Sequence, residues 1–395
     1  MFKRVVIIVM DSVGIGSASD AEIFGDQGAD TLGHIEALHS IDCPTLKSLG
    51  LSRIARIAPS IEPVRGIFGR MLEASTGKDT TSGHWEFMGH PVKEPFPIFY
   101  DAFPKTLMDR FVEVTGYEYL GNEVASGTEI IERLGEEHIR TGKPIIYTSA
   151  DSVFQIAAHE EVIPVKELYR ICELVRKEVC VSDANVGRII ARPFVGTKGH
   201  FKRTANRHDY SRMPDNKLYT ELLVESGIPV VGVGKIGDIF ANVGISASYP
   251  TTSNEHGMAK VTQLLASDFT HGLLLVNLVD FDSLCGHRRD PYGYKRAIEN
   301  FDAQLKGLLA VLEEDTLLLI TADHGNDPTW HGTDHTREIV PLLGYYQDCK
   351  GEIYLGDRDT FSDIGQTILE NFALPLGEYG SSFLKEICII REGNS

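Results

Sequence analysis

The chain has 395 residues, of which 42% are apolar and 24% charged, so it can bury a core in two domains or in one domain with an insertion. Its formal net charge of −18 argues against duplex nucleic acid or an anionic membrane surface as a partner. The cysteines are scattered without a CxxC pair, which is typical of reduced thiols in a cytoplasmic protein; they are Cys43, Cys172, Cys180, Cys285, Cys349 and Cys388.

The first predicted element is the apolar run from Val5 to Met10, which Asp11 ends. The run is short and no small-residue cleavage site follows it, so it indicates a buried strand and not a signal peptide. No apolar stretch of the sequence approaches the roughly 18 residues that a membrane span needs. We therefore expect a cytoplasmic protein without a membrane segment.

The next distinctive region runs from Ser75 to Glu86 and is dense in hydroxyl groups between glycines. A hydroxyl becomes a nucleophile at neutral pH when a base takes its proton or when a bound metal ion lowers its pKa. Thr80, Thr81 and Ser82 are all candidates, and the pattern alone does not choose among them. The glycines would permit a tight strand-to-helix turn with backbone N–H groups facing a phosphate. An ordinary Gly/Ser/Thr loop is the alternative.

The middle of the chain has a different character, which begins after Pro95-Phe96-Pro97. It contains a predicted helix from Pro164 to Val179 and one predicted strand from Pro144 to Ala150, which Asp151 ends. Residues 188–217 hold eight Lys or Arg and two acids, a local reversal in an acidic chain. We predict an inserted cap domain over 97–217 and a core domain formed by 1–96 and 218–395.

Three more apolar runs follow, and each also ends in a polar residue with useful chemistry. They are Pro229 to Gly234 before Lys235, Gly272 to Val279 before Asp280-Phe281-Asp282, and Thr316 to Ala322 before Asp323-His324. Continuous apolar runs are typical of strands covered on both faces, and an amphipathic helix over Arg296 to Leu312 alternates with them. The pattern predicts a doubly wound α/β core with a parallel sheet, in which ligands bind beyond the carboxyl ends of the strands.

Aspartate and histidine side chains gather at or near these predicted strand ends: Asp11, Asp282, His287, Asp323, His324 and His335. Such a mixed oxygen and nitrogen set suits two divalent cations of the Mn, Zn or Mg type, which would also offset the repulsion among the carboxylates. Paired metal ions clamp the attacking and leaving oxygens of a phosphoryl transfer. Taken singly, such an aspartate is often a helix cap, such a histidine a packed side chain, and Cys285 a small buried apolar residue. Their joint occurrence favours a metal centre.

These motifs resemble those of the phosphopentomutases of the alkaline phosphatase superfamily, over essentially the full length of the chain. The matching segments are Val9–Gly16, Thr76–Thr80, Gly83–Glu86, Thr148–Val153, Asn206–Tyr210, Val279–Asp282, Gly286–Asp290 and Thr321–Asp327. The Asp-His-Gly element marks only the superfamily. The Gly-Lys-Asp-Thr and Gly-His-Arg-Arg-Asp segments together are specific to the mutase.

The resemblance implies an alkaline-phosphatase-like doubly wound core sheet with an inserted α+β cap, and it implies that Thr80 becomes phosphorylated. It assigns one metal ion to Asp282, His287 and His335, and the other to Asp11, Asp323, His324 and the Thr80 oxygen. Manganese is the metal that it implies. It also implies that the cap residues Asp151, Arg188 and Arg203, with Lys235 from the core, contact a sugar phosphate.

The activity implied is the interconversion of ribose or deoxyribose 1-phosphate and 5-phosphate through a 1,5-bisphosphate, primed by a sugar bisphosphate such as glucose 1,6-bisphosphate. An alkaline-phosphatase-like hydrolase would use the same metals in an exposed site. A cofactor-independent phosphoglycerate mutase would show a serine nucleophile and a different inserted domain. A non-catalytic binding module would not need a hydroxyl nucleophile beside metal ligands. Small sugar phosphates are the expected partners, and the sequence does not reveal the oligomeric state.

Overall fold

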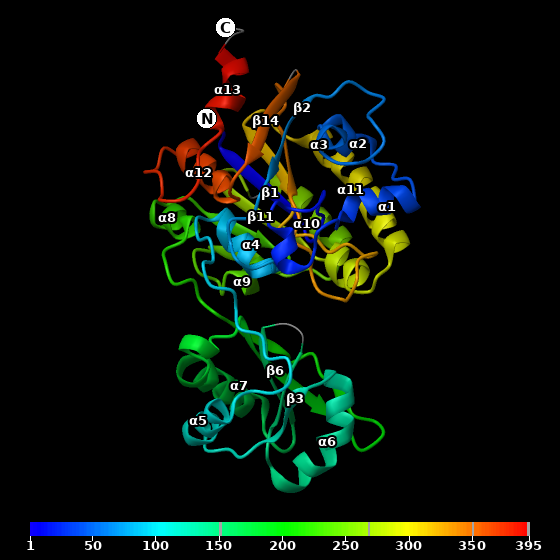
Figure 1. The fold of residues 1–395 in the computed structure, drawn as a ribbon. Helices are drawn as coiled ribbons and strands as arrows, with labels where there is room; N and C mark the ends of the chain where they lie inside the picture. The colour runs from blue at the N-terminus through cyan, green and yellow to red at the C-terminus, as the bar shows by residue number, and fades with distance from the viewer. Residues whose placement is uncertain (150–151, 268, 350, 393–395) are drawn as a thin grey trace. The chain divides into compact units, whose positions relative to one another are not determined.

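The computed structural model describes residues 1–149, 152–267, 269–349 and 351–392. The chain divides into two compact units, the first formed by 1–94 and 214–395 and the second by 95–213. Figure 1 shows the second unit as the cyan and green middle of the chain.

The first unit is built on an eight-stranded sheet with the order β10-β9-β11-β1-β12-β13-β2-β14. The strands are β1 (Arg4–Met10), β2 (Gly66–Met71), β9 (Val230–Val233), β10 (Ala247–Tyr249), β11 (Gly272–Leu278), β12 (Thr316–Thr321), β13 (Val340–Tyr345) and β14 (Glu352–Arg358). Every residue of β1, β11 and β12 is buried, as expected for central strands that are covered on both faces.

Strand direction brings distant segments to one edge of this sheet. β1 runs parallel to β11 and β12, with Met10 beside Leu278 and Val9 beside Thr321. β13 alone in this sheet runs the other way, so its first residue, Val340, lies at the edge where its neighbours end. The carboxyl ends of β1, β2, β11 and β12 and the start of β13 therefore share one edge.

Helices cover both faces of this sheet. Figure 1 shows one group formed by α1 (Thr31–Leu38), α2 (Pro44–Ser48), α3 (Leu51–Ile54), α10 (Asn254–Ala266) and α11 (Pro291–Val311). Another group contains α4 (Thr80–Phe87), α8 (Tyr219–Glu225), α9 (Ile236–Ile239) and α12 (Ser362–Asn371), while α13 (Leu384–Glu392) packs near β14. This arrangement is the doubly wound α/β layer structure.

The second unit has its own sheet, in the order β3-β4-β5-β6-β7, with β8 also paired to β6. The strands are β3 (Leu120–Val124), β4 (Ile145–Thr148), β5 (Val153–His159), β6 (Arg188–Val195), β7 (Lys202–Arg203) and β8 (His208–Ser211). The helices are α5 (Lys105–Thr115), α6 (Gly127–Thr141) and α7 (Val165–Leu174), which continues as a π-helical segment over Val175–Val179. The sequence predicted only one of these strands.

The two faces of the second sheet are covered unequally. Phe111 of α5 and Leu168 of α7 pack against Phe154 and Ile189 on one face, in a cluster that is fully buried. On the other face, Ile130 and Ile131 of α6 form a smaller apolar cluster with Ile145, Tyr147, Ala157 and Phe194. Polar side chains of β6 and β8 continue this second face beyond α6.

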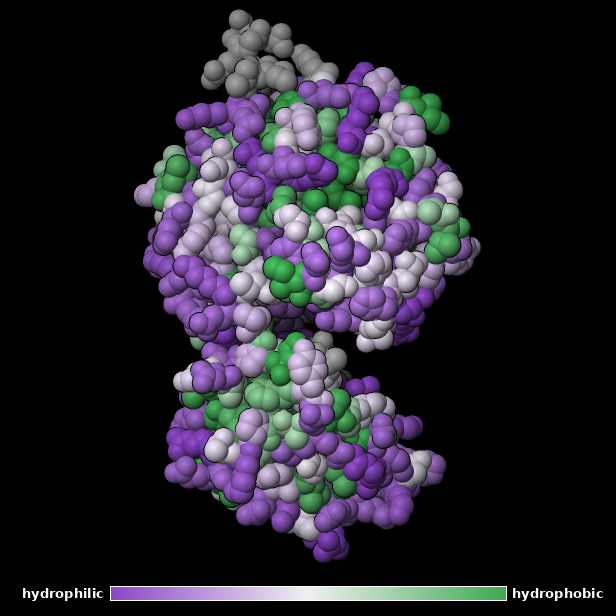
Figure 2. Space-filling model, in the orientation of Figure 1, coloured by the Kyte–Doolittle hydropathy of each residue, from purple (hydrophilic) through white to green (hydrophobic). Residues whose placement is uncertain are grey.

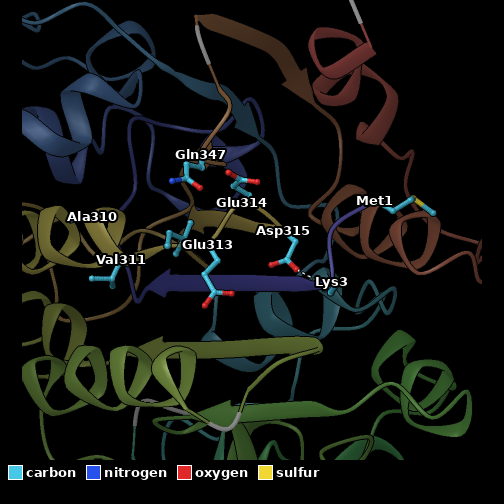
Figure 3. A pocket seen from close by; sticks show the side chains of 9 residues that line it. Met1, Lys3, Ala310, Val311, Glu313, Glu314, Asp315 and Gln347 are labelled. Atoms are coloured by element: carbon cyan, nitrogen blue, oxygen red, sulfur yellow. Dashed lines mark ion pairs between the residues drawn. The ribbon is translucent and has the colours of Figure 1, made fainter. Parts of the chain in front are cut away.

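On the face shown in Figure 2, polar side chains cover most of the surface of the first unit. A depression of about 630 Å³ lies at the opposite end of β1 from Asp11, where Lys3 pairs with Asp315 at 2.8 Å (Figure 3). Within the described part of the chain, no helix combines the length and apolar character that crossing a bilayer requires.

Candidate metal centre and nucleophile

Three of the Asp and His positions follow directly from the strand ends. Asp11 comes after β1, Asp323 lies two residues beyond β12, and Asp282 lies in the π-helical segment η4 (Phe281–Gly286) that follows β11. Ser12, just after Asp11, has a φ of 73°, a left-handed conformation that is uncommon for a residue with a side chain. Local strain of this kind, like a π-helical turn, is often found at functional sites.

One group of potential ligand atoms comes from Asp282, His287 and His335, and these atoms lie within 4.8 Å of one another. The Asp282 carboxylate is 3.1 Å from His287 Nε2 and 3.4 Å from His335 Nε2. The two imidazole Nε2 atoms are 3.1 Å apart. This is the same set that the resemblance assigns to one metal ion.

A second group lies next to the first and is more deeply buried. Asp11, Asp282 and His324 also place ligand atoms within 4.8 Å of one another. His324 Nε2 is 3.5 Å from Asp11 Oδ1 and 3.5 Å from Asp323 Oδ2. Geometry thus makes Asp282 common to both groups, whereas the resemblance gives the second ion Asp323 in place of Asp282.

The three imidazoles share one hydrogen-bonding arrangement. Nδ1 of His287 lies 2.8 Å from the Thr333 carbonyl, Nδ1 of His324 3.0 Å from that of Gly325, and Nδ1 of His335 3.0 Å from that of Lys78. Because a carbonyl only accepts, each neutral ring carries its proton on Nδ1 and turns the Nε2 lone pair toward the carboxylates. Metal-ligating histidines are commonly oriented in this way.

The charges of the cluster also fit bound cations. Burial raises the pKa of Asp11, and repulsion from Asp323 and Asp282 raises it further. Among the described residues, Asp11 Oδ1 has no hydrogen-bond partner although the atom is buried, and the nearest ring nitrogen to Asp323 Oδ2 is His84 Nδ1, at 3.2 Å. A divalent cation would supply the missing partner and relieve both the carboxylate repulsion and the facing Nε2 lone pairs. The residues present therefore fit a pair of divalent metal ions.

Thr80 is the hydroxyl that reaches this cluster. Its Oγ1 lies 3.2 Å from His324 Nε2, at the first residue of α4. The Ser82 hydroxyl instead donates to Asp79 at 2.6 Å, and Asp79 caps the helix by accepting from the backbone of Thr81 and Ser82. Gly83 permits this approach, because a Cβ there would come within 2.4 Å of the Asp323 carbonyl.

The loop before Thr80 is fastened to the segment that carries His335. Arg337 is 3% exposed and donates to the Gly77 carbonyl at 2.7 Å and to Glu73 at 2.8 Å. The bond between His335 Nδ1 and the Lys78 carbonyl adds a second tie, one residue further along the loop. These hydrogen bonds therefore couple the position of Thr80, the candidate nucleophile, to that of His335, a candidate metal ligand.

The remaining predicted site residues fall in different places. Lys235 lies at the carboxyl end of β9, where its charge acts to lower the pKa of Asp11. Arg188 and Arg203 belong to the second unit, on β6 and β7. Asp151 lies outside the described residues. Burial raises the pKa of Cys285 to about 12, which is consistent with an unionised thiol.

Two buried asparagines support the carboxylates and were not predicted as site residues. Asn277 Nδ2 donates to Asp11 at 2.7 Å, and Asn326 Nδ2 donates to Asp282 at 2.8 Å. Such outer contacts orient ligands and tune the metal ion. Asn277 could have been recognised from the sequence, because it is a polar amide within an otherwise apolar predicted strand.

Comparison with known proteins places this geometry in a family. Residues 3–376 match the metalloenzyme superfamily. The chain is similar to the PH0037 protein of Pyrococcus horikoshii, at 13% identity and a TM-score of 0.50, over 96% of this chain and 100% of that one. It is also similar to a phosphoglycerate mutase of Leishmania mexicana, at 14% identity and a TM-score of 0.47, over 97% of each chain.

A third similar structure is the cofactor-independent phosphoglycerate mutase of Thermoplasma acidophilum, at 12% identity and a TM-score of 0.40, over 93% of this chain and 99% of that one. Likeness at such low identities says nothing about the activity. The match over 3–376 is what decides the family, and it implies an enzyme that uses divalent metal ions. The chain belongs to the metalloenzyme superfamily and has the alkaline-phosphatase-like α/β fold that its sequence predicts.

Proposed function

We propose that this protein is a phosphopentomutase, which moves a phosphoryl group between carbons 1 and 5 of ribose or deoxyribose. The observation that carries the proposal is the Thr80 hydroxyl at 3.2 Å from His324 Nε2, beside two overlapping sets of metal-type ligands. The motifs around Thr80 and His287, which resemble those of the mutase, supply the choice of substrate.

In this proposal Thr80 carries the phosphoryl group between turnovers. It passes the group to the free hydroxyl of a pentose monophosphate, and the other phosphate of the resulting 1,5-bisphosphate returns to Thr80. Divalent ions, Mn²⁺ by resemblance, would neutralise the charge of the transferring group when bound. Asp11, Asp323 and His324 would hold one ion, and Asp282, His287 and His335 the other.

The surrounding residues have supporting roles. Arg337 and His335 hold the carbonyls of Gly77 and Lys78, so that the Thr80 hydroxyl stays aimed at the cluster. Lys235 adds positive charge at the same edge of the sheet, where it would attract a phosphate. Arg188, Arg203 and Asp151 would contact the sugar phosphate from the cap, with the arginines suited to phosphate by their planar fork.

The assay that tests the proposal follows ribose 1-phosphate by phosphorus NMR in the presence of Mn²⁺ and glucose 1,6-bisphosphate. Ribose 5-phosphate is the expected product. Inorganic phosphate as the main product would favour a hydrolase, and turnover of 3-phosphoglycerate in place of the pentose would favour a phosphoglycerate mutase. Intact mass measured after priming is expected to show one added phosphoryl group on the chain.

Replacement of the nucleophile gives a sharper test. Thr80→Ala is expected to abolish turnover and phosphorylation while the melting temperature stays near that of the wild type. Thr81→Ala is the matched control and should keep most of the activity, because its side chain lies outside the contacts that fix Thr80. Full activity of Thr80→Ala would shift the role to Thr81 or Ser82.

A further inference from the structure

Asn326 is a fully buried amide whose orientation is set by its two neighbours. Its Oδ1 accepts from Arg289 Nη1 at 2.8 Å, and its Nδ2 donates to Asp282 Oδ1 at 2.8 Å. A guanidinium only donates and a carboxylate only accepts, so the reverse orientation would place donor against donor and oxygen against oxygen. Arg289 therefore helps to decide which end of the amide faces Asp282, a potential ligand in both groups of the metal centre.

The guanidinium of Arg289 is itself held by backbone carbonyls. Its Nη1 also donates to the carbonyls of Gly286 at 3.3 Å and of Asp327 at 2.8 Å. Its Nε donates to the carbonyl of Gly332 at 2.7 Å, and its Nη2 to that of Asp334 at 3.2 Å. One side chain thus connects the two segments of the chain that carry the candidate histidine ligands on either side of it.

The backbone at the end of η4 permits this contact. Arg289 has a φ of 53°, a left-handed conformation that is unfavourable for a residue with a Cβ and persists only where the surroundings hold it. Its N–H donates to the Gly286 carbonyl at 3.0 Å, which closes a turn after η4. Gly286 leaves room for the amide, because a Cβ there would come within 2.7 Å of Asn326 Nδ2.

We propose that Arg289 is a positioning residue for the metal centre, which holds the Asn326 amide so that Nδ2 faces Asp282 and keeps that carboxylate turned toward the cations. In this role Arg289 acts through Asn326 and not by contact with a metal ion or a substrate. Outer contacts of this kind orient metal ligands. The role of Arg289 rests on the metal centre of the proposed function and not on its sugar substrate.

The sign of the effect separates this role from that of a nearby charge. Removal of a positive charge beside a cation site strengthens cation binding by Coulomb's law. Loss of the hold on Asn326 weakens cation binding, because the amide is then free to turn away from Asp282. Arg289→Met, which keeps most of the stem, is therefore expected to bind Mn²⁺ about tenfold more weakly, within the range usual for loss of an outer contact.

Competition with a Mn²⁺ chelator, applied to Arg289→Met, Asn326→Ala and the double variant, tests whether Arg289 acts through Asn326. The double variant is expected to bind Mn²⁺ within about twofold of Asn326→Ala alone, because residues that act through one contact are not additive. Arg288→Met is the matched control. It removes the same charge from the exposed neighbouring residue, and it should bind Mn²⁺ at least as tightly as the wild type.

Melting of the metal-free proteins shows whether each variant is folded. If Arg289→Met does not fold, Arg289→Lys replaces it, because lysine keeps the charge while its ammonium ends one bond short of Nη1 and lacks the planar fork. The same loss of Mn²⁺ affinity is then expected. Wild-type or tighter Mn²⁺ binding in the folded variant, or effects at Arg289 and Asn326 that multiply in the double variant, would overturn the proposal.

Failure of this role and failure of the proposed function are distinguishable. A protein that shows the expected Mn²⁺ affinities but lacks pentomutase activity would retain the role of Arg289 and lose the proposed function. An active mutase in which Arg289→Met binds Mn²⁺ as the wild type does would retain the function and lose that role. Absence of Mn²⁺ binding by the wild type would overturn both.

Discussion

Replacing Glu86 with glutamine is expected to destabilise the protein and to slow turnover together. Glu86 is fully buried, on α4, six residues after Thr80. One of its oxygens accepts from the backbone of Ala74 at 2.9 Å and of Phe361 at 2.8 Å, and from the Thr360 hydroxyl at 2.8 Å. The other accepts from the backbone and the hydroxyl of Ser75 at 2.7 and 2.5 Å. This carboxylate thus ties the loop before Thr80 to its helix.

The magnitude follows from counting donors. A glutamine amide keeps one acceptor oxygen and places an NH₂ group where the other oxygen was. If the NH₂ faces Ala74 and Phe361, a partly buried and a buried backbone N–H group lose their acceptor; if it faces Ser75, one buried N–H group does. Each unsatisfied buried donor costs about 1–3 kcal/mol. We therefore expect a loss of about 2–5 kcal/mol, once repulsion between facing donors is included.

Thermal unfolding of Glu86→Gln, with Mn²⁺ absent, measures this cost directly. Since about 1 kcal/mol shifts the melting temperature by roughly 2–4 °C in domains of this order of size, a fall of several degrees is expected. Glu94→Gln, at an exposed position of the same unit, is the control and should stay within about 0.5 kcal/mol of the wild type. A melting temperature and kcat equal to those of the wild type would refute the reasoning.

Further predictions concern the metal centre. Burial and neighbouring carboxylates raise the pKa of Asp11, and the hydrogen bond to Asp282 raises that of His287 despite burial. Both groups must lose a proton to bind a cation, so Mn²⁺ affinity should fall as the pH is lowered, with proton release seen by calorimetry in different buffers; an affinity independent of pH would contradict this. Asn326→Ala removes a 2.8 Å bond to Asp282 and should weaken Mn²⁺ binding by about 10–100-fold in chelator competition. Removal of the metal with a chelator should lower the melting temperature, because a cation present at a concentration of a hundred times its Kd stabilises the folded protein by about 2.7 kcal/mol. A melting temperature that chelation leaves unchanged would count against a bound metal.

The central strands of the first unit could be predicted because the sequence signal of a buried strand is local. The apolar runs at Val5, Gly272 and Thr316 became β1, β11 and β12 with bounds within a residue or two of those expected. α11 was expected from Arg296 but begins at Pro291, because Asp290 caps it and proline suits a first turn. The apolar stripe that identified this helix begins only at Ile298, about two turns after Pro291.

Most strands of the cap sheet were missed. The missed strands β5 and β6 are largely apolar and buried, but β7 and β8 lack an apolar signature. β7 is two residues long, Lys202 and Arg203, and β8 contains His208 to Ser211 with no fully buried residue. Pairing with β6 makes them strands, and pairing is a tertiary property that propensity alone does not reveal. The Asp and His positions expected as ligands lie close together because the parallel strands β1, β11 and β12 end at one edge of the sheet and the antiparallel strand β13 begins there.

The choice among the three hydroxyls could not be made from residue types. It depends on where α4 begins: Asp79 takes the N-cap and engages the Ser82 hydroxyl, which leaves Thr80 at the start of the helix facing His324. The roles of Asn277 and Asn326 likewise depend on which side chain faces which carboxylate.

Anomalous X-ray diffraction from crystals grown with Mn²⁺ tests the central claim most directly. We expect two manganese peaks about 3.5–4 Å apart, one bonded by Asp282, His287 and His335 and the other by Asp11, Asp323, His324 and the Thr80 oxygen. A single peak, a pair bound by other residues, or Thr80 turned away from both ions would contradict it.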